Sequence, residues 1–305
     1  MIKRYTNKTI TWIDAETPQR EELQGLMQEY SLDPSVVRDL HLPTYKEKIV
    51  AQPNYLYLVM HFPALNHSSA KDDIDQEIDF VVGKEFIITT RYENIDALER
   101  FEKLFEVNTI LDKHLMEDHA GYVLYYIIKE LYKNIGDEVD AINDAIKDIK
   151  GKVFEGKEKE MVFSISKINK DLLHLNHTTK THQQILESLA EAGEKIFDAN
   201  FKENCDKILN EYYRIQDLLT QSTEFLKEIR GTNDSLLNTK QNEIMKTLTI
   251  IAFLALPFTI ITGLFQMNTS GTPLIGSNND WGIIVSVELC AMIALFIFAK
   301  IKKWL

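Results

Sequence analysis

Two apolar segments near the C-terminus constrain the fold of this chain more than any other feature. Residues 247–265 form a stretch of nineteen residues with no charged side chain, and residues 281–299 form another with a single charge, Glu288. Each stretch matches the length of about 20 residues that a helix needs to span a hydrocarbon core. A buried hairpin in a globular core is the alternative, which the flanking residues disfavour.

The charges around these segments indicate their orientation. The loop between them, residues 266–280, contains no lysine or arginine, whereas lysines flank the outer ends at positions 240, 246, 300, 302 and 303. Basic residues favour the cytoplasmic side of a membrane. We therefore expect a multi-pass protein of the cell inner (plasma) membrane with both termini in the cytoplasm. Trp281 and Trp304 lie at opposite ends of the second segment, as interfacial aromatic residues do.

The remainder of the chain has the composition of a folded domain outside the bilayer. Of its 305 residues 26% are charged, and the mean hydropathy is −0.20. The net charge of −12 argues against a nucleic-acid partner, because binding to phosphates needs a basic face. The only cysteines, Cys205 and Cys290, lie far apart, which fits a reducing compartment. No nucleotide-binding loop or catalytic constellation is visible, so the sequence predicts a protein that is not an enzyme.

The first part of the chain, residues 1–110, has the pattern of an α/β domain. Short β-rich runs cover residues 9–13 and 54–62, and a hairpin is indicated where residues 78–82 and 86–90 flank a turn with Gly83. Residues 17–22 predict a helix start with Pro18 in its first turn. The polar residues 66–76 predict an exposed loop, and strand patterns end at about Ile95.

Residues 111–245 predict a stalk of long helices. Apolar residues recur at steps of three and four over 120–150 and over 158–192, with breaks expected at 151–157 and near Ala192-Gly193. The first stripe consists of Leu124, Ile127, Ile128, Leu131, Ile135, Val139, Ile142, Ile146 and Ile149. A further helix from about 203 to 264 would be roughly 90 Å long and would need a bundle or an oligomer to bury it. Residues 246–305 then form the membrane domain.

The first membrane segment is the better candidate to line a pore. Two helices cannot enclose one, so several subunits would each contribute a helix. Polar and small residues recur along one face at steps of about 3.5 residues, a spacing suited to packing of like helices around an axis. The row comprises Asn238, Asn242, Met245, Thr249, Ala252, Leu256, Thr259 and Gly263. The alternative is that this row arises by chance on a helix that faces lipid and lines no pore.

Residues 242–251 (NEIMKTLTII) and 256–259 (LPFT) resemble the pore helix of the CorA family of divalent-cation transporters. Residues 12–14, the predicted strand 86–91 and the basic C-terminal end are similar to that family as well. The resemblance implies an α/β cytoplasmic N-terminal domain, long stalk helices, two C-terminal transmembrane helices and a homopentamer.

The family signature after the pore helix is Gly-Met-Asn, whereas this chain has Gln266-Met267-Asn268. The resemblance implies that a ring of Asn268 side chains contacts the water shell of Mg²⁺, with further pore or selectivity positions at Met267, Gln266, Thr259 and Asn242. A hydrophobic gate is expected at Met245, Leu248 and Leu256, where apolar side chains exclude water. The altered first residue of the signature leaves the transported ion open among Mg²⁺, Co²⁺, Ni²⁺ and Zn²⁺.

Other polar residues suggest metal regulation or coupling. In the family, metal bound between cytoplasmic domains closes the pore, and Asp72, Asp73 and Asp234 are the candidates here; a solvated loop is the alternative for the first two. Three histidines, His174, His177 and His182, share a helical region and are either bystanders or zinc ligands. Glu288 at bilayer depth either serves function or hydrogen-bonds a neighbouring helix.

Three functions therefore compete. The favoured one is a Mg²⁺ channel driven by the membrane potential, with no cofactor other than Mg²⁺ as transported and regulatory ion. The second is Zn²⁺ transport coupled to protons through Glu288. The third is a non-conducting, metal-sensing membrane scaffold.

Overall fold

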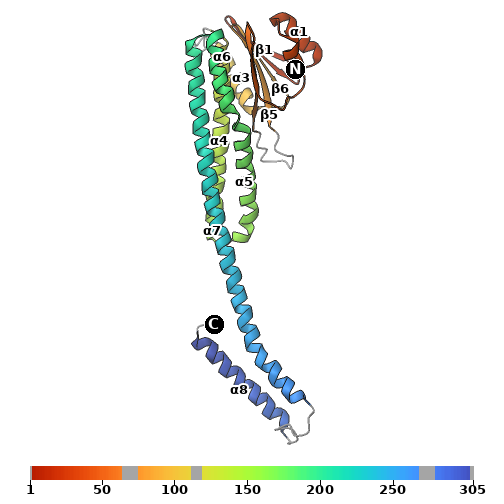
Figure 1. Ribbon diagram of the computed structural model, residues 1–305, viewed down its shortest axis with the longest axis vertical. Helices are drawn as coiled ribbons and strands as arrows, with labels where there is room; N and C mark the ends of the chain where they lie inside the picture. The colour runs from red at the N-terminus through yellow and green to blue at the C-terminus, as the bar shows by residue number, and fades with distance from the viewer. Residues whose placement is uncertain (1, 64–74, 111–118, 268–278, 303–305) are drawn as a thin grey trace. The chain divides into compact units, whose positions relative to one another are not determined.

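The computed structural model describes residues 2–63, 75–110, 119–267 and 279–302. The chain divides into two compact units, Met1–Arg230 and Gly231–Leu305. The first unit contains a sheet and a set of long helices, and the second contains the two apolar segments (Figure 1).

Six strands form one sheet in the first unit, in the order β1-β2-β6-β5-β4-β3. All neighbours are antiparallel except β2 and β6, which are parallel. The predicted hairpin is confirmed as β5 and β6, and Gly83 is required there because a Cβ would overlap the Phe86 ring. The strands are β1 (Ile2–Asn7), β2 (Ile10–Glu16), β3 (Lys48–Ala51), β4 (Tyr55–Phe62), β5 (Gln76–Gly83) and β6 (Phe86–Arg91).

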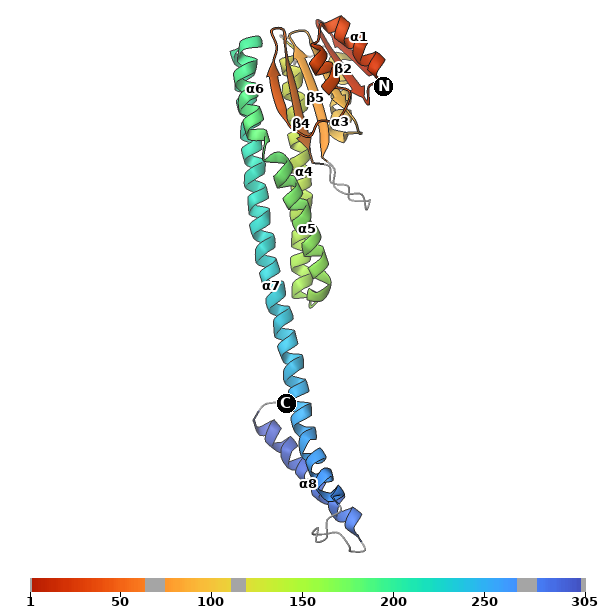
Figure 2. The ribbon, with the colours of Figure 1, turned by 45° about the vertical axis from the view of Figure 1, so that its right-hand side comes forward.

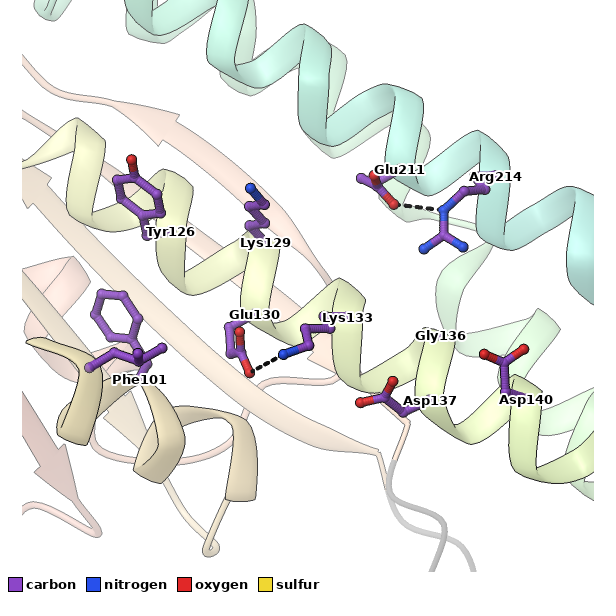
Figure 3. A pocket seen from close by; sticks show the side chains of 11 residues that line it. Phe101, Tyr126, Lys129, Glu130, Lys133, Gly136, Asp137, Asp140, Glu211 and Arg214 are labelled. Carbon is purple, nitrogen blue, oxygen red and sulfur yellow. Dashed lines mark hydrogen bonds and ion pairs between the residues drawn. The ribbon is translucent and has the colours of Figure 1, made fainter. Parts of the chain in front are cut away.

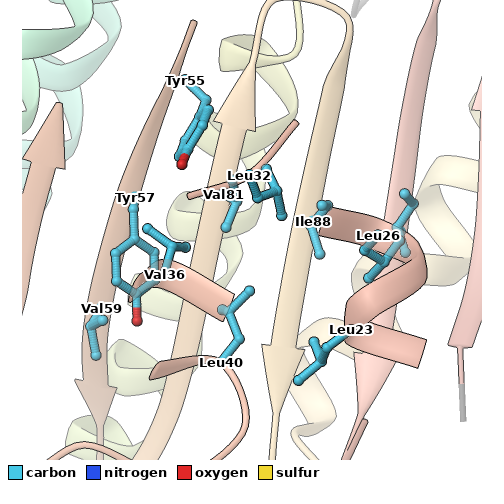
Figure 4. Close-up of a cluster of buried hydrophobic side chains, with 11 residues drawn as sticks. Leu23, Leu26, Leu32, Val36, Leu40, Tyr55, Tyr57, Val59, Val81 and Ile88 are labelled. Carbon is cyan, nitrogen blue, oxygen red and sulfur yellow. The ribbon is translucent and has the colours of Figure 1, made fainter. Parts of the chain in front are cut away.

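Helices cover both faces of this sheet (Figure 2). On one face α1 (Arg20–Tyr30) and α2 (Pro34–Asp39) contribute Leu23, Leu26 and Val36 to a buried cluster with strand residues, which Figure 4 shows. Successive strand residues point to opposite faces. Ile13 of β2 therefore joins that cluster, while Trp12 packs on Phe101 and Phe105 of α3 (Asp96–Ile110) on the other face.

Some details of the N-terminal prediction were wrong. The edge strands β1 and β3 were not predicted, because one lies at the basic start of the chain and the other is only four residues long. Pro18 precedes α1 instead of lying in its first turn, since Gln19 caps the helix. The predicted loop 66–76 lies largely outside the described residues, and β5 already begins at Gln76.

Long helices follow, and their apolar stripe is confirmed. All nine residues of the predicted stripe are buried in α4 (Gly121–Phe154). The break at 151–157 is confirmed between α4 and α5 (Glu158–Thr179). The stretch predicted as one helix to residue 192 is instead two, α5 and α6 (His182–Ile196), and the next break lies at Phe197-Asp198 instead of at Gly193.

Tertiary contacts explain both differences. At the α5–α6 turn, the hydroxyl of Thr179 accepts a hydrogen bond from Gln216 Nε2 (2.7 Å), and His182 is fully buried. Gly193 lies inside α6, where the Phe201 ring occupies the space that a Cβ would take, so this glycine allows close packing and does not end the helix. The carboxylate of Asp198 then accepts the backbone N–H of Phe201 (2.8 Å) where the next helix begins. Gln216 lies 37 residues from Thr179, so the local apolar pattern gives no sign of this contact.

The long helix predicted from about 203 to 264 is confirmed as α7 (Ala199–Gln266), with Pro257 inside it. The second apolar segment is α8 (Asp280–Ile301). Both helices contain an 18-residue window that is apolar enough to cross a membrane and only 6% buried within the chain. In both views α8 lies beside the last part of α7 (Figure 1, Figure 2).

Candidate functional site: the membrane part of α7

The membrane part of α7 has two opposite faces. One face packs on α8 and includes Ile250, which is buried, and Leu254, Phe258, Ile261 and Phe265, which are half-buried. With 3.6 residues per turn, residues three and four apart lie on one side of a helix. These five residues are all apolar, as expected for a contact between two helices of the same chain, and one polar contact, described below, lies beside them.

The predicted row lies on the other face. All eight of its residues, from Asn238 to Gly263, are exposed. At about 100° per residue, Leu256 and Thr259 lie roughly opposite Leu254 and Ile261. Because α8 packs on the opposite side of α7, it leaves the row open to other copies of the chain.

Hydroxyl groups on this face present oxygen lone pairs outward. Thr249 donates its proton to the Met245 carbonyl at 2.8 Å, and Thr259 donates to the Leu256 carbonyl at 2.9 Å. A hydroxyl has one proton to donate and two lone pairs with which to accept. Because the proton is used within the helix, each exposed threonine oxygen is an acceptor, which suits the water shell of a cation.

Apolar residues predicted as a gate are also exposed. Met245 is 52% exposed, and Leu248 and Leu256 are each 57% exposed. Met245 and Leu256 lie within the row, whereas Leu248 lies about 60° around the helix from Met245. The structure therefore brings two of the three onto the face of the polar row and places Leu248 at its border. Gly263 has nothing within 4 Å of a Cβ position, so its face is open to close approach of a neighbour.

The signature segment begins at the end of this helix. Gln266 is the last residue of α7, and among the described residues outside glycine only Lys8, Thr17 and Ser31 have positive φ. Gln266 therefore replaces the glycine of the signature without backbone strain. The backbone N–H of Met267 donates to the Leu264 carbonyl at 3.4 Å, and Asn268 lies outside the described residues.

Glu288 does not lie among the pore-face residues. It is half-buried on the side of α8 that also carries Ala291, Leu295 and Ala299, and its Oε1 accepts a hydrogen bond from Thr262 Oγ1 of α7 at 2.6 Å. Of the two roles considered for this acid, hydrogen bonding to a neighbouring helix is the one that the geometry supports.

Of the candidate regulatory residues, only Asp234 lies among the described residues, and it belongs to the second unit. Asp72 and Asp73 lie outside the described residues, and Asp234 is exposed on α7. Within the described ranges, no group of three or more His, Cys, Asp or Glu side chains is arranged to hold a metal ion. Their role as metal ligands stays a prediction.

Of the three histidines, His182 is positioned by hydrogen bonds at both of its ring nitrogens. His182 Nε2 contacts the His61 carbonyl at 2.8 Å, and because a carbonyl only accepts, Nε2 is the donor. Its Nδ1 then accepts the hydroxyl of Tyr132 at 2.7 Å. Both ring nitrogens are thus used, which leaves no lone pair for zinc. His174 lies 3.5 Å from Asp75, whose Oδ1 also accepts from Thr178.

Sequence reasoning missed the polar network around His182 because its members are distant in the chain. A cavity of about 610 Å³ adjoins it, lined by Glu47, His61 and Glu77 among others. Glu77 Oε2 accepts from the Thr44 backbone N–H at 2.6 Å and lies 3.1 Å from His61 Nε2. Burial lowers the pKa of His61, but these contacts with Glu77 and the Thr44 carbonyl outweigh it, and the pKa is raised.

A second cavity of about 440 Å³ lies between α3, α4 and α7 (Figure 3). Some of its charged side chains are paired within the protein: Arg214 contacts Glu211 at 2.8 Å, and Glu130 contacts Lys133 and also Arg100, which lies outside the lining. Because these pairs are satisfied and the described residues contain no group of three metal-binding side chains, the membrane part of α7 remains the candidate site.

Comparisons with known proteins cover nearly the whole chain. A family model for CorA-like Mg²⁺ transporter proteins matches residues 7–303. A cobalt/magnesium transport protein CorA of Methanocaldococcus jannaschii is 24% identical over 95% of this chain and 90% of its own length, and one of Thermotoga maritima is 21% identical over 98% and 84%. The complete structure of the CorA magnesium transporter from Methanocaldococcus jannaschii superposes with a TM-score of 0.81 at 20% identity, covering 97% of this chain and 92% of that one.

Proposed function

The chain belongs to the CorA-like Mg²⁺ transporter family, and on that premise we propose that it carries divalent cations, Mg²⁺ foremost, across a membrane. The observation that carries the proposal is the exposed row of polar and small residues on α7, opposite the face that packs on α8. Co²⁺ is a second cargo, as the names of the relatives suggest.

The pathway is formed by several copies of the chain, each contributing one α7. Five copies follow from the family resemblance. This assembly is supported by the exposure of apolar residues such as Met245 and Leu256, more than half of whose surface is open within one chain. The bilayer covers the outward faces, and the ring of copies covers the row.

Transport in this pathway keeps much of the water shell of the ion. Mg²⁺ gives up its waters reluctantly and prefers oxygen partners. Asn268 amide oxygens at the outer mouth, followed by Thr259 and Asn242 along the row, accept hydrogen bonds from those waters without stripping them. Weak binding at several positions allows an ion to enter and leave, and the apolar ring of Met245 and Leu256, with Leu248 at its border, closes the path by excluding water.

The membrane potential drives uptake without a cofactor. A divalent ion gains about 4.6 kcal/mol per 100 mV of inside-negative potential, twice the value for a single charge. This direction requires both termini and the first unit to lie in the cytoplasm, in the inner (plasma) membrane, as the lysines that flank α7 and α8 favour. Mg²⁺ binding by Asp234, Asp72 and Asp73 would close the pore from that side.

Uptake of Mg²⁺ into proteoliposomes tests the proposal. The purified full chain is expected to take up Mg²⁺ in proportion to an inside-negative potential, and Asn268→Ala is expected to abolish uptake while the oligomer keeps its mass. Asn279→Ala, an exposed amide just before α8, is the matched control and retains uptake. A well-folded oligomer that conducts no divalent ion would instead favour the scaffold function.

A further inference from the structure

Thr262 differs from the other membrane threonines in where it donates its proton. Thr247, Thr249 and Thr259 donate to carbonyls of their own helix. Thr262 donates to Glu288 Oε1 of α8 at 2.6 Å. A threonine in a helix can satisfy its hydroxyl locally. Thr262 therefore bonds to another helix because Glu288 provides an acceptor there.

The Thr262–Glu288 bond lies in a helix contact that is otherwise apolar on the side of α8. Around Glu288 the contacting side of α8 is small or aliphatic, with Ala291 and Leu295 half-buried and Ala299 buried. Apolar contacts in a bilayer allow two helices to slide or rotate, because lipid tails are as apolar as the helices. A hydrogen bond between them fixes both their register and their rotation.

The contact lies one turn before the signature segment. Thr262 is four residues before Gln266, about 6 Å along the helix axis. In this last turn Leu264 is 58% exposed, Met267 is 55% exposed, and only Phe265 is half-buried. The final carbonyls of a helix also lack partners within it. Among the described residues, little packing therefore holds the end of α7, and the Thr262–Glu288 bond supplies a specific restraint.

We propose that Thr262 and Glu288 form an interhelical pin, a hydrogen bond that positions the last turn of α7, and through it Gln266 and Met267, for ion selection. Glu288 is in this account a positioning residue that acts as a hydrogen-bond acceptor instead of a carrier of protons. The inference deepens the proposed function and rests on it, because ion selection requires transport.

Pairs of variants distinguish whether Glu288 is needed as a hydrogen-bond acceptor or as an acid. Glu288→Gln keeps an acceptor oxygen and removes the acid, whereas Glu288→Leu removes both. Thr262→Ser keeps the hydroxyl, whereas Thr262→Val removes it at similar volume. Ser286→Ala is the matched control, since Ser286 donates to the Gly282 carbonyl of its own helix and is exposed.

Two readouts are needed, and one of them is independent of transport. A spin label at Met267→Cys, in a Cys290→Ser background, reports the mobility of the α7 end in liposomes; Cys205 is buried. The preference for Mg²⁺ over Co²⁺ in uptake reports selection. Glu288→Leu and Thr262→Val should each raise mobility and shift the ion preference several-fold, and the double variant should add little. Glu288→Gln, Thr262→Ser and Ser286→Ala should leave both readouts as they are.

The contrary outcomes are distinct. If Glu288→Gln shifts the ion preference as much as Glu288→Leu, the acid itself is required and the pin is wrong. If mobility rises and ion preference does not, the pin exists but does not govern selection, which also overturns the inference. If the unmodified chain transports no divalent ion, the proposed function fails, and label mobility alone still decides whether the pin holds the end of α7.

Discussion

Thr259 and Thr262 lie three residues apart in α7, and their hydroxyl groups donate in different directions. Thr259 donates within its helix and exposes oxygen lone pairs on the face of the polar row, while Thr262 donates across to Glu288. The same residue type thus leaves its oxygen exposed in one position and joins two helices in the other. The direction in which a membrane threonine donates thus depends on whether another helix places an acceptor beside it.

Asp79 is the residue in the first unit whose titration should be easiest to observe. It is fully buried in β5 and accepts from Thr90 at 3.0 Å and Tyr57 at 3.3 Å. Burial, together with the nearby Glu77 carboxylate, raises its pKa to about 7. The folded state therefore retains a proton that the unfolded chain, with an ordinary carboxyl, has already released.

The sign of the pH effect follows from linkage. Because the pKa of Asp79 is raised in the folded state, the protonated carboxyl stabilises the fold fully at pH values below the ordinary carboxyl pKa. This stabilisation is lost as the pH rises to about 7. We expect Asp79→Asn, which keeps an acceptor oxygen but has no carboxyl proton to lose, to abolish this decrease in stability with rising pH. Thermal unfolding of the full chain should show the variant gaining stability over the parent from pH 4 to pH 7. An unchanged difference across this range would show that Asp79 does not titrate there.

At the scale of elements, the repeat of apolar residues predicted α4 and α7 well. The whole stripe of α4 is buried, since a period of 3.6 residues needs no information from elsewhere in the chain. The α5–α6 break was missed because it depends on Gln216 and on buried His182, and not on a local glycine or proline. Likewise the row on α7 could be predicted from the sequence, whereas the partner of Glu288 could be identified only once the position of α8 was known.

Gly193 and Gly151 give a matched test of this packing. A Cβ at Gly193 of α6 would overlap Phe201, whereas nothing lies within 4 Å of a Cβ at Gly151 of α4. Gly193→Ala should lower the free energy of unfolding by about 1–3 kcal/mol, as overpacking does. Gly151→Ala should raise it by up to about 1 kcal/mol because it removes backbone freedom. Denaturant midpoints measure both, and equal shifts would contradict the packing of α6 on α7.

At the scale of the whole molecule, one chain supplies a folded α/β unit and two apolar helices, and the proposed conducting structure requires several copies. The described residues leave the polar row of α7 exposed, since α8 occupies the opposite face. In the proposed function this face lines the ion path, and several copies must surround it to enclose that path. Assembly and transport are therefore linked in the proposal.

The two spans also predict the topology of the molecule. Since lysines flank the outer ends of α7 and α8 and the loop 266–280 has none, both termini should lie on one side of the membrane. Epitopes at the two ends should become accessible to antibody together, in inside-out vesicles and not in right-side-out vesicles. Ends that are accessible from opposite sides would mean an odd number of spans and would contradict this account.

The central claim is that the face of α7 opposite α8 lines the ion path, and thiol block of transport tests it most directly. In a Cys290→Ser background, Ala252→Cys lies on the row and Leu254→Cys lies on the face toward α8. A water-soluble thiol reagent should block Mg²⁺ uptake into proteoliposomes through Ala252→Cys and leave uptake through Leu254→Cys unchanged. Block at Leu254→Cys with none at Ala252→Cys would assign the ion path to the other face and contradict the claim.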